Sequence, residues 1–508
     1  MNDLILTCDA GTTGLKCTLF DAAGRAVQSV RQDYGTDYPR PGWAEQDTGH
    51  FTQAATGCIR ELLSQISPSR IACVGLSGTM NGMIAVDDSG NALTPNIIHS
   101  DARADGLLDE IRAVISPEEF YNLTGNRLDF HYTLPKILWL RKNMPDVYAR
   151  ARWFLNTKDF VYGFLTGTMG ITDYSDASLT IAMDIRRGVW AEGLLKSLGL
   201  DAKRMPQIRP GHDVSGRVSK EAASLTGLLP GTPVSVGGGD GACTSRGAGL
   251  ASAGEAYCYI GSSAWVAQMT DEPLLDPQAR IFNYLDMDGV SNHSCGTVQC
   301  GAAAYDWAAA NFMGLSELPP AQAYNEMESQ ARQIAPGAEG VMFLPTLMGE
   351  RTPYWDANTR GVLMGFTLYH DSRHIARAVY EGVAFALYSC AEVMRECGAP
   401  VKSLMLTGGG ARSGFWPDII ASVFGLGTRV HGAPGEATSL GSAITAGVGA
   451  GIFKTYQEGV STIRARSAHA VNESWKAAYA AAYATYTRLY PQMKPVFDDI
   501  ARRVAEEG

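Results

Sequence analysis

Two aspartates of this sequence stand beside glycine-rich turns in surroundings that could support chemistry on a phosphate group. The first, Asp9, ends an apolar stretch and leads into AGTTGLK, which contains Thr12, Thr13 and Lys16. Glycine lets consecutive backbone N–H groups turn toward an anion, and the hydroxyl groups and the lysine add donors. Asp9 would repel a phosphate in this loop unless a cation lay between them, so the pattern indicates Mg²⁺ held through carboxylate and water. The alternative is an ordinary hairpin in which the aspartate and glycines only form the turn.

The second aspartate, Asp240, lies within VSVGGGDGACTSRG, where a short apolar run meets three glycines. A helix that begins here would stabilise the ionised carboxylate through its dipole, which favours a group able to accept a proton. Asp240 could instead cap the helix N-terminus. Gly237, Gly239 and Ala242 also fit the dinucleotide fingerprint G-x-G-x-x-G/A. That interpretation is disfavoured, because Asp240 would repel the pyrophosphate and no acidic residue follows about 20 positions later.

A second hydroxyl-rich loop, Gly261-Ser262-Ser263, stands between two apolar stretches, as AGTTG does. CDAGTTGLKCTLFD and CYIGSSAWVAQMTD share a strand, a glycine, two hydroxyl residues, a strand and a closing aspartate. The echo predicts related units in the two halves, and two such loops could hold a polyphosphate between them. No GxxxxGK[ST] motif occurs, which excludes a P-loop enzyme, and Thr79 replaces the last glycine of a GxSxG nucleophile elbow.

The elements that must position these residues alternate between strand and helix. Alternating apolar residues predict a strand meander over 4–33, a helix over 47–66 and a buried strand over 70–78. Residues 102–200 have a helical pattern, and a second meander begins near 254. Helices are predicted at 304–314, 371–397, 415–425 and 437–453, strands at 403–408 and 429–434, and an Ala/Tyr-rich helix from about 471. The pattern predicts an α/β fold, and a chain of 508 residues exceeds one core, so we expect domains at 1–248 and 249–508.

Composition narrows the range of partners. The formal net charge is −10 with no long basic run, which argues against nucleic acid or an anionic membrane as partner. No apolar run reaches the length of a membrane span, and the first residues lack the basic region of a signal peptide. The ten cysteines are scattered and contain no CxxC pair. We therefore expect a cytoplasmic protein that acts on small molecules.

Taken together, the motifs resemble the FGGY carbohydrate kinases, most closely the xylulokinase group, over nearly the whole chain. The stretches that carry the resemblance are DAGTTGLK, PGWAEQD, GLSGTMNG, LTGNRLDFHYTLPKILWL, TKDFVYGFLTG, TDYSDAS, GGGDGACTSRGAG, IGSSAWV, ERTPYWDANTRGVLMGFT, YEGVAFAL, LTGGGARSGFW and EATSLGSAITAGVGAGIF. The resemblance implies two ribonuclease H-like domains, as in actin and hexokinase, with ATP and sugar in the cleft between them. The N-terminal domain would hold the sugar and the first phosphate loop, and the C-terminal domain would bind the nucleotide.

The resemblance also implies roles for individual residues. Asp240 matches the catalytic base that takes the proton of the sugar hydroxyl, with the surrounding glycines clearing space for sugar and phosphate. Asp9 matches the carboxylate associated with Mg²⁺, which Asp240 could share through water. ATP- and phosphate-binding positions are Thr12, Thr13, Lys16, Gly261, Ser262, Ser263, Gly408, Gly409, Gly410, Ala411 and Ser413; substrate-binding positions are Met80, Asn81, Asp101 and Arg103.

The sugar-side positions depart from the family pattern. Asn81 stands where xylulokinases usually carry histidine, and His99-Ser100 replaces Trp-Asn before Asp101. An amide keeps hydrogen-bonding capacity but does not titrate near pH 7. The expected activity is therefore ATP-dependent phosphorylation of the terminal hydroxyl of a ketopentose, D-xylulose first, with another ketose (ribulose, L-xylulose) or a glycerol-like polyol as alternatives. A sugar sensor or actin-like switch without transfer is the rival class, and a homodimer is the family expectation.

Three further sets of polar side chains have both a structural and a ligand-binding interpretation. Asp173 and Asp176 could face the active site or cap turns. Glu436 is expected to be a helix-start carboxylate rather than a nucleotide contact. The stripe of Tyr479, Tyr483, Tyr486 and Tyr490 is expected to pack rather than to bind a ligand.

Overall fold

The computed structural model describes residues 3–507 and divides them into two compact units. Unit 1 contains the chain up to Ala253 together with Met269–His293 and Gly435–Ile463. Unit 2 contains Gly254–Gln268, Ser294–Pro434 and the chain from Arg464 onward. Each unit is α/β, as predicted. The boundary predicted at 248 stays a prediction about the two halves of the chain, because the compact units exchange segments across it.

The sheet of unit 1 has the order β13-β14-β5-β1-β2-β3, with β15 also paired to β5. β1 (Leu4–Ala10), β2 (Gly14–Asp21) and β3 (Ala26–Asp33) form the predicted antiparallel meander. β5 (Ile71–Gly78) lies parallel to β1, and both β14 (Pro233–Val234) and β15 (Gly238–Gly239) lie parallel to β5. β13 (Gly216–Arg217) completes the edge.

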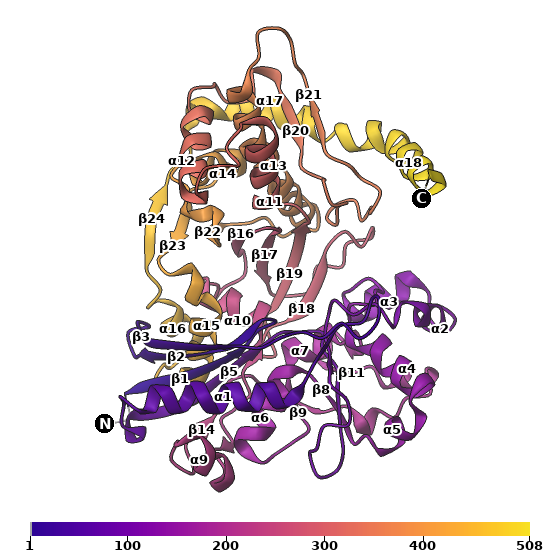
Figure 1. The fold of residues 1–508 in the computed structure, drawn as a ribbon, viewed down its shortest axis with the longest axis vertical. Helices are drawn as coiled ribbons and strands as arrows, with labels where there is room; N and C mark the ends of the chain where they lie inside the picture. Colours follow the sequence, from indigo (N-terminus) through magenta and orange to yellow (C-terminus); the bar gives the residue numbers. More distant parts are fainter. Residues whose placement is uncertain (1–2, 508) are drawn as a thin grey trace. The chain divides into compact units, whose positions relative to one another are not determined.

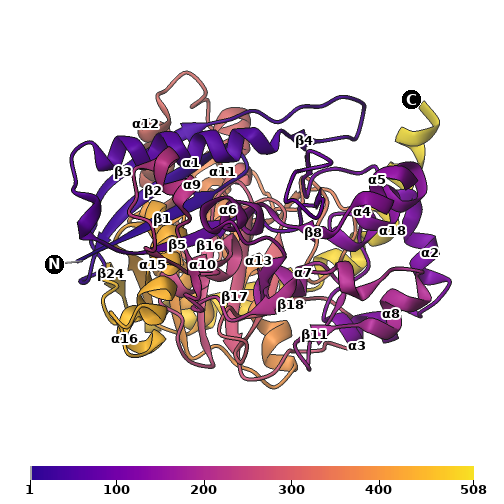
Figure 2. The same cartoon turned by 90° about the horizontal axis from the view of Figure 1, so that it is seen from below.

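Helices cover both faces of this sheet because side chains alternate along each strand. On one face, Leu4, Leu6 and Cys8 share a buried cluster with residues of α1 (Thr48–Leu63). On the other, Ile5 shares a cluster with Leu440 of α15 (Ala437–Gly449). The two helices are seen on opposite sides of β1–β3 in Figure 2. The α/β layering of unit 1 thus includes a helix from the last quarter of the chain.

The close contact between α10 (Asp240–Gly247) and α15 depends on two glycines. A Cβ on Gly247 would lie 1.7 Å from the Ala437 carbonyl oxygen, and one on Gly441 would lie 1.8 Å from the Cys243 carbonyl oxygen. Only bare backbone permits this approach. α15 therefore fixes the helix that follows the glycine turn of Asp240.

The remainder of unit 1 is mainly helical, as predicted for residues 102–200. Its helices are α2 (Leu108–Arg112), α3 (Pro117–Thr124), α4 (Thr133–Asn143), α5 (Pro145–Arg150), α6 (Thr157–Thr166), α7 (Tyr174–Leu179), α8 (Glu192–Ser197), α9 (Lys220–Thr226) and α16 (Tyr456–Val460). Short strands connect them: β4 (Glu45–Gln46), β6 (Ile84–Val86), β7 (Asn96–Ile97), β8 (Trp153–Leu155), β9 (Ile171–Asp173), β10 (Met183–Asp184), β11 (Val189–Trp190), β12 (Gln207–Arg209) and β18 (Phe282–Leu285).

In unit 2, the strands β19, β17, β16, β22, β23 and β24 follow one another in a second sheet. β16 (Glu255–Ile260) pairs antiparallel with β17 (Ala264–Thr270) and parallel with β22 (Ser403–Thr407), which repeats the pairing of β1 with β2 and β5. β19 (Asn292–Val298), β23 (Thr428–His431) and β24 (Ala465–His469) complete this set. The two similar sequence motifs therefore fold into two similar hairpins, each of which also pairs with a parallel strand.

The long α13 (Ser372–Glu396) packs on α11, α12 and α14 and lies among them in Figure 1, and the described part of unit 2 has five further α-helices. These are α11 (Ala302–Phe312), α12 (Pro320–Ala331), α14 (Trp416–Phe424), α17 (Lys476–Tyr486) and α18 (Leu489–Glu507). A hairpin of β20 (Met342–Leu344) and β21 (Val362–Met364) packs on α13. Among the helices of residues 3–507, none has the length and apolarity needed to cross a membrane.

Some sequence predictions were wrong. β23 is not the last strand, because residues 465–469 return antiparallel to it as β24. The polar segment 320–331 forms α12, which the pattern did not indicate, and the tail is two helices instead of one.

Candidate functional site

Asp9 and Asp240 lie at the same end of the sheet of unit 1. In the strand register, Asp9 of β1 is paired with Ser77 of β5, and Ser77 is paired with Gly238 of β15. Because these strands are parallel, their carboxyl ends share one edge, where ligands bind in open α/β sheets. Asp240 follows β15 directly and begins α10.

Asp240 does not cap the helix, so that alternative was wrong. The N-cap is Gly239, and Asp240 Oδ1 accepts the neighbouring Gly241 N–H at 2.8 Å. Burial and the nearby Asp9 carboxylate raise the pKa of Asp240 to about 7, while the Gly241 N–H opposes this shift. A carboxyl group with this pKa can accept and release a proton near neutral pH.

Asp9 is a second carboxyl group whose pKa is shifted. Burial raises the pKa of Asp9, and Lys16 and Ser77 oppose the rise. Its Oδ1 is buried and has no hydrogen-bond partner in the part of the chain that the structure describes. An unpaired buried carboxylate oxygen beside a second carboxylate is destabilising unless a cation or donor joins it.

These residues fit Mg²⁺ bound through few protein ligands. Residues 3–507 contain no group of three or more His, Cys, Asp or Glu side chains able to hold a metal ion by themselves. Mg²⁺ in phosphate-transfer sites is held through one or two carboxylates, with water and substrate phosphates completing its shell. Asp9 and Asp240 supply that number of carboxylates.

The first predicted phosphate loop is a three-residue turn between β1 and β2. Thr12 Oγ1 lies 3.5 Å from Thr79 Oγ1, and Arg31 donates to Thr13 Oγ1 at 2.7 Å. Lys16 donates to Glu436 Oε2 at 3.1 Å and to the Gly435 carbonyl at 2.8 Å. A phosphate in this loop would therefore have to draw Lys16 away from an existing ion pair.

Glu436 precedes α15 without capping it through its side chain. Its position at the start of the helix is as predicted, and its contact with Lys16 is new. This pair could not be predicted from local patterns because the two residues are 420 positions apart.

The space beside the glycines that precede Asp240 is filled by neighbouring side chains and is not open. A Cβ on Gly238 would lie 2.0 Å from Met287 Sδ, and one on Gly239 would lie 2.5 Å from atoms of the Met80 side chain. The expectation that the glycines clear room for ligands is wrong for these two positions. They let Met287 and Met80 pack against the backbone that carries Asp240.

A buried polar network holds the turn before Asp240. Ser175 Oγ accepts the Gly239 N–H at 3.0 Å and donates to Asp173 Oδ2 at 2.5 Å. Asp173 caps α7 by accepting the Ser175 and Asp176 N–H groups. Asp173 therefore has the capping role, and through Ser175 it also reaches the active turn.

Lys158 lies at the centre of this network. Its Nζ is 2.6 Å from Asp159, 3.2 Å from Asp173 and 3.4 Å from Asp176. Burial opposes the charge of Lys158, but the three aspartates outweigh it and keep the pKa above its ordinary value. Burial raises the pKa of Asp176, whose carboxyl oxygens accept no hydrogen bond from the described residues. A protonated Asp176 would leave the cluster with one net negative charge, which is less costly to bury.

On the sugar side, Asn81 follows Met80 in a left-handed backbone conformation, with φ of 65°. Asparagine adopts this conformation more readily than most residues. Its carbonyl oxygen accepts from Lys136 Nζ at 3.0 Å, and its Oδ1 is buried without a hydrogen-bond partner among residues 3–507. The amide is thus available to a ligand group that donates a hydrogen bond.

Asp101 and Arg103 form a separate buried pair. Arg103 Nε donates to Asp101 Oδ1 at 2.8 Å and Nη2 to Oδ2 at 2.7 Å, and Nη2 also contacts Glu45 at 2.7 Å. The guanidinium lies 3.7 Å from the Trp43 ring centroid. Their hydrogen bonds and ion pairs therefore join them to residues 43–45, so their assignment to the substrate pocket stays a prediction.

The second loop and the GGGARS turn meet at one cavity within unit 2. The cavity has a volume of about 660 Å³, a size typical of ligand sites, and Gly261, Ser262, Gly409, Gly410 and Ser413 line it. A Cβ on Gly409 would meet no atom within 4 Å, so this backbone faces open space. Residues of these two motifs, which are about 150 positions apart in the sequence, therefore line one cavity, and their role in binding ATP stays a prediction.

Ser263, Gly408 and Ala411 do not line this cavity. A Cβ on Gly408, where φ is 87°, would lie 2.5 Å from the Ile260 carbonyl oxygen, so this glycine is needed for the turn. Ser413 Oγ donates to Glu328 Oε2 at 2.7 Å and accepts the N–H groups of Phe415 and Trp416. These three hydrogen bonds of Ser413 hold the turn at the start of α14.

Sequence reasoning missed the opposite wall of the cavity. Tyr305 and Asp306 of α11 and Tyr324, Asn325 and Glu328 of α12 line it. Tyr305 and Asp306 lie in the stretch AYDWAAANF, which the sequence predicted as a helix but not as part of a site. The α12 residues had no sequence signal, because an amphipathic polar segment carries no motif.

The tyrosine stripe packs, as predicted. Tyr479, Tyr483 and Tyr486 surround the Phe385 ring, and Tyr490 stacks on Tyr354 at 3.7 Å.

Comparison with known proteins gives a consistent result. Residues 4–247 match the N-terminal domain of the FGGY family of carbohydrate kinases, and residues 256–450 match its C-terminal domain. The chain is 31% identical to a xylulose kinase of Escherichia coli K12, over 96% of this chain and 99% of that protein. It is 30% identical to a gluconokinase of Bacillus subtilis, over 84% and 83%.

Among solved structures, the xylulose kinase from Rhodospirillum rubrum superposes with a TM-score of 0.90 at 25% identity, covering 97% of this chain and 100% of that one. The names of these relatives thus indicate different substrates, although each match covers more than four fifths of this chain. The chain belongs to the FGGY family of carbohydrate kinases.

Proposed function

We propose that this chain transfers the γ-phosphoryl group of ATP to the terminal hydroxyl of a ketopentose, with D-xylulose as the first candidate. The observation that carries the proposal is Asp240, a carboxyl group with a pKa of about 7 next to Asp9 at the carboxyl edge of a sheet. The similarity to xylulose kinases over almost the whole chain supports the choice of sugar.

In the proposed reaction Asp240 is the general base. Its carboxylate takes the proton of the sugar hydroxyl as that oxygen bonds to the γ-phosphorus. The bond from the γ-phosphorus to the bridging oxygen breaks, and ADP leaves with the electron pair. Phosphoryl transfer needs mainly positioning and charge neutralisation, so one base beside phosphate-binding loops is sufficient.

The remaining residues bind and orient. The cavity of about 660 Å³ would hold the nucleoside, with the bare backbone of Gly409 against it and Ser262 near the phosphates. Thr12, Thr13 and Lys16 would contact the phosphates from the first loop. Asp9 and Asp240 would hold Mg²⁺, which when bound neutralises phosphate charge.

Asn81 is the proposed specificity residue on the sugar side. Its buried Oδ1 can accept a hydrogen bond from a sugar hydroxyl, and it carries no charge. Because a gluconokinase is as similar as several xylulose kinases, gluconate belongs with ribulose, L-xylulose and glycerol among the alternatives to be tested.

A coupled ADP-release assay with a substrate panel tests the proposal. We expect D-xylulose to stimulate ADP release most strongly and Asp240→Asn to lower kcat by about 10²–10⁴-fold, the usual contribution of a general base. The KM for ATP should change little. Asp109→Asn, an exposed aspartate paired with Arg112, is the matched control and should retain full activity.

ATP hydrolysis without stimulation by any member of the panel would instead support the switch or sensor class. Near-normal turnover of Asp240→Asn would overturn the assignment of the base. A gluconate response stronger than that of D-xylulose would leave the kinase in place and change its substrate.

A further inference from the structure

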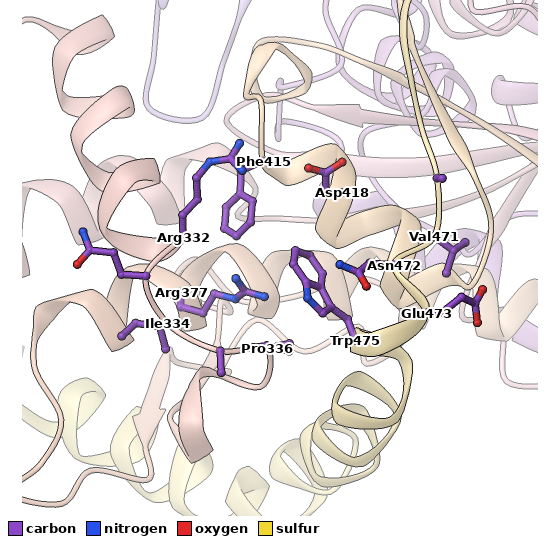
Figure 3. A pocket seen from close by; sticks show the side chains of 13 residues that line it. Arg332, Ile334, Pro336, Arg377, Phe415, Asp418, Val471, Asn472, Glu473 and Trp475 are labelled. Carbon is purple, nitrogen blue, oxygen red and sulfur yellow. The ribbon is translucent and has the colours of Figure 1, made fainter.

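Unit 2 contains a second, larger cavity of about 860 Å³ that the proposed reaction does not use. It lies between the segment after α12, the first turns of α13 and α14, and the 470–475 segment that links β24 to α17. Figure 3 shows Arg332 and Arg377 entering from one side and Asp418, Asn472 and Glu473 on the other, with Trp475 between them. Its lining differs entirely from that of the 660 Å³ cavity.

Arg377 is the feature that marks this cavity as a binding site. Its side chain is only 1% exposed, although it lines the cavity. Nε donates to Glu381 Oε1 and Nη2 donates to Tyr479 Oη, both at 2.6 Å. These two bonds use Nε and Nη2. Because Arg377 also lines the cavity, its guanidinium can donate to an acceptor that is bound there.

The aromatic residues supply an apolar wall next to that donor. Trp475 is partly exposed, and the Arg377 guanidinium lies 5.0 Å from its ring centroid. Phe415 is buried and contacts both arginines, with Arg332 at 4.4 Å from the ring centroid and Arg377 at 4.9 Å. A flat ligand group could therefore lie against Trp475 while its acceptor atoms meet the guanidinium groups.

We propose that this cavity binds a small ring compound carrying a carboxylate or phosphate group, with the anion on Arg377 and Arg332 and the ring on Trp475. Arginine suits this role because its planar fork donates to two oxygens of such an anion at once. A volume of about 860 Å³ lies within the range of small-molecule sites.

The site is connected to the first cavity through one helix. Arg332 donates to Glu328 Oε1 through Nε at 3.0 Å and Nη2 at 2.7 Å. The other oxygen of Glu328 accepts from Ser413 Oγ at 2.7 Å and from the Gly414 N–H at 3.2 Å. An anion that draws on Arg332 thus competes with the carboxylate that holds the Ser413 turn. This coupling, unlike the binding itself, rests on the proposed function.

Calorimetric titration of the full-length protein tests the site, with phenyl phosphate and benzoate as probes and ADP present at saturation to fill the first cavity. We expect one additional binding event for at least one probe, and its identity distinguishes phosphate from carboxylate. Trp475→Leu and Arg377→Lys should each weaken it about tenfold or more, as loss of a charge-assisted contact does. Arg395→Gln, which removes another arginine of α13 from an exposed pair with Glu392, is the matched control and should bind as the wild type does.

Absence of binding by both probes, or binding that survives Trp475→Leu and Arg377→Lys unchanged, would overturn the proposal. If Arg377→Lys does not fold, Trp475→Leu decides alone, because this side chain is partly exposed. Failure of ADP itself to bind would count against the proposed kinase function instead. With the site confirmed, a bound probe should change the KM for ATP more than kcat.

Discussion

At the scale of single residues, the turn before Asp240 is held by Ser175, a residue of the TDYSDAS motif to which the sequence assigned no role. The only described side chain that holds the Gly239 N–H is Ser175, which in turn donates to Asp173 of the lysine–aspartate cluster. Ser175 makes no bond to Asp240 itself, so we regard it as a positioning residue.

Ser175→Ala should therefore lower kcat by about tenfold while the KM for ATP stays unchanged. The loss leaves the Gly239 N–H without a buried acceptor and frees the turn, at a cost of about 1–3 kcal/mol in stability. Steady-state kinetics and chemical denaturation measure the two effects.

Ser178→Ala is the control that separates an effect on the position of Asp240 from an effect on the stability of the protein. Ser178 lies on the same helix and is equally buried, but its hydroxyl donates to Tyr174 and accepts the Leu285 N–H. It should destabilise the protein to a similar degree without the loss of kcat. Equal kcat values for the two variants would contradict a positioning role for Ser175.

The buried carboxyl group of Glu350 should make the stability of the protein depend on pH. It is 5% exposed, and its Oε1 accepts the Gln299 and Arg351 N–H groups, each at 2.8 Å. Burial raises the pKa of Glu350 to about 8, above the ordinary 4.5. The folded protein therefore keeps a proton that the unfolded chain releases, so the stabilisation is complete below pH 4.5 and is lost as pH rises toward 8.

Urea unfolding of the wild type and Glu350→Gln between pH 6 and 8 measures this effect. One pH unit in this window corresponds to about 1.4 kcal/mol for one group. The free energy of unfolding of the wild type should fall relative to the variant by roughly 2–3 kcal/mol, because glutamine keeps the acceptor oxygen and does not titrate. Parallel pH profiles of the two proteins would contradict the prediction.

At the scale of elements, the packing of α10 on α15 depends on the absence of side chains. The Cβ of Gly441→Ala would lie 1.8 Å from the Cys243 carbonyl oxygen and 2.8 Å from the Gly247 N. Both are backbone atoms that cannot move aside, so the helices must separate. We expect a loss of about 1–3 kcal/mol in the free energy of unfolding, typical of overpacking.

The matched control is Gly435→Ala, two residues before the same helix, where a Cβ would meet nothing within 4 Å. Thermal and urea unfolding should show little change for the control. A Gly441→Ala protein as stable as the wild type would mean that the two helices are not constrained at this contact. Since α10 begins at Asp240, the same substitution should also lower activity.

Local patterns were sufficient to predict most elements and the residues of the loops. The hairpin around AGTTG, β5 and α10 follow from alternation and from glycine punctuation, both of which act over a few residues. The ion pair of Lys16 with Glu436, the hydrogen bond of Ser413 to Glu328 and the wall formed by α12 did not follow. They depend on which segments the fold brings together, and that information is spread over the whole chain.

At the scale of the whole molecule, the chain order does not follow the division into units. α15 and α16 come from residues 435–463 and complete the core of unit 1, where Leu440 and Ile444 join Ile5, Phe20 and Cys73. A cut at residue 248, which the sequence suggested as a domain boundary, would remove this layer from the sheet.

A fragment of residues 1–248 should therefore be insoluble or lack cooperative unfolding, because one face of its sheet would expose Ile5, Phe20 and Cys73 to water. Co-expression with residues 249–508 should restore a soluble complex, since the missing helices would then be supplied in trans. Size-exclusion chromatography and circular dichroism of the fragment and of the complex measure both outcomes. A monomeric, cooperatively folding 1–248 fragment would mean that α15 covers the sheet without being required for its core, and that the linear boundary describes an independent folding domain.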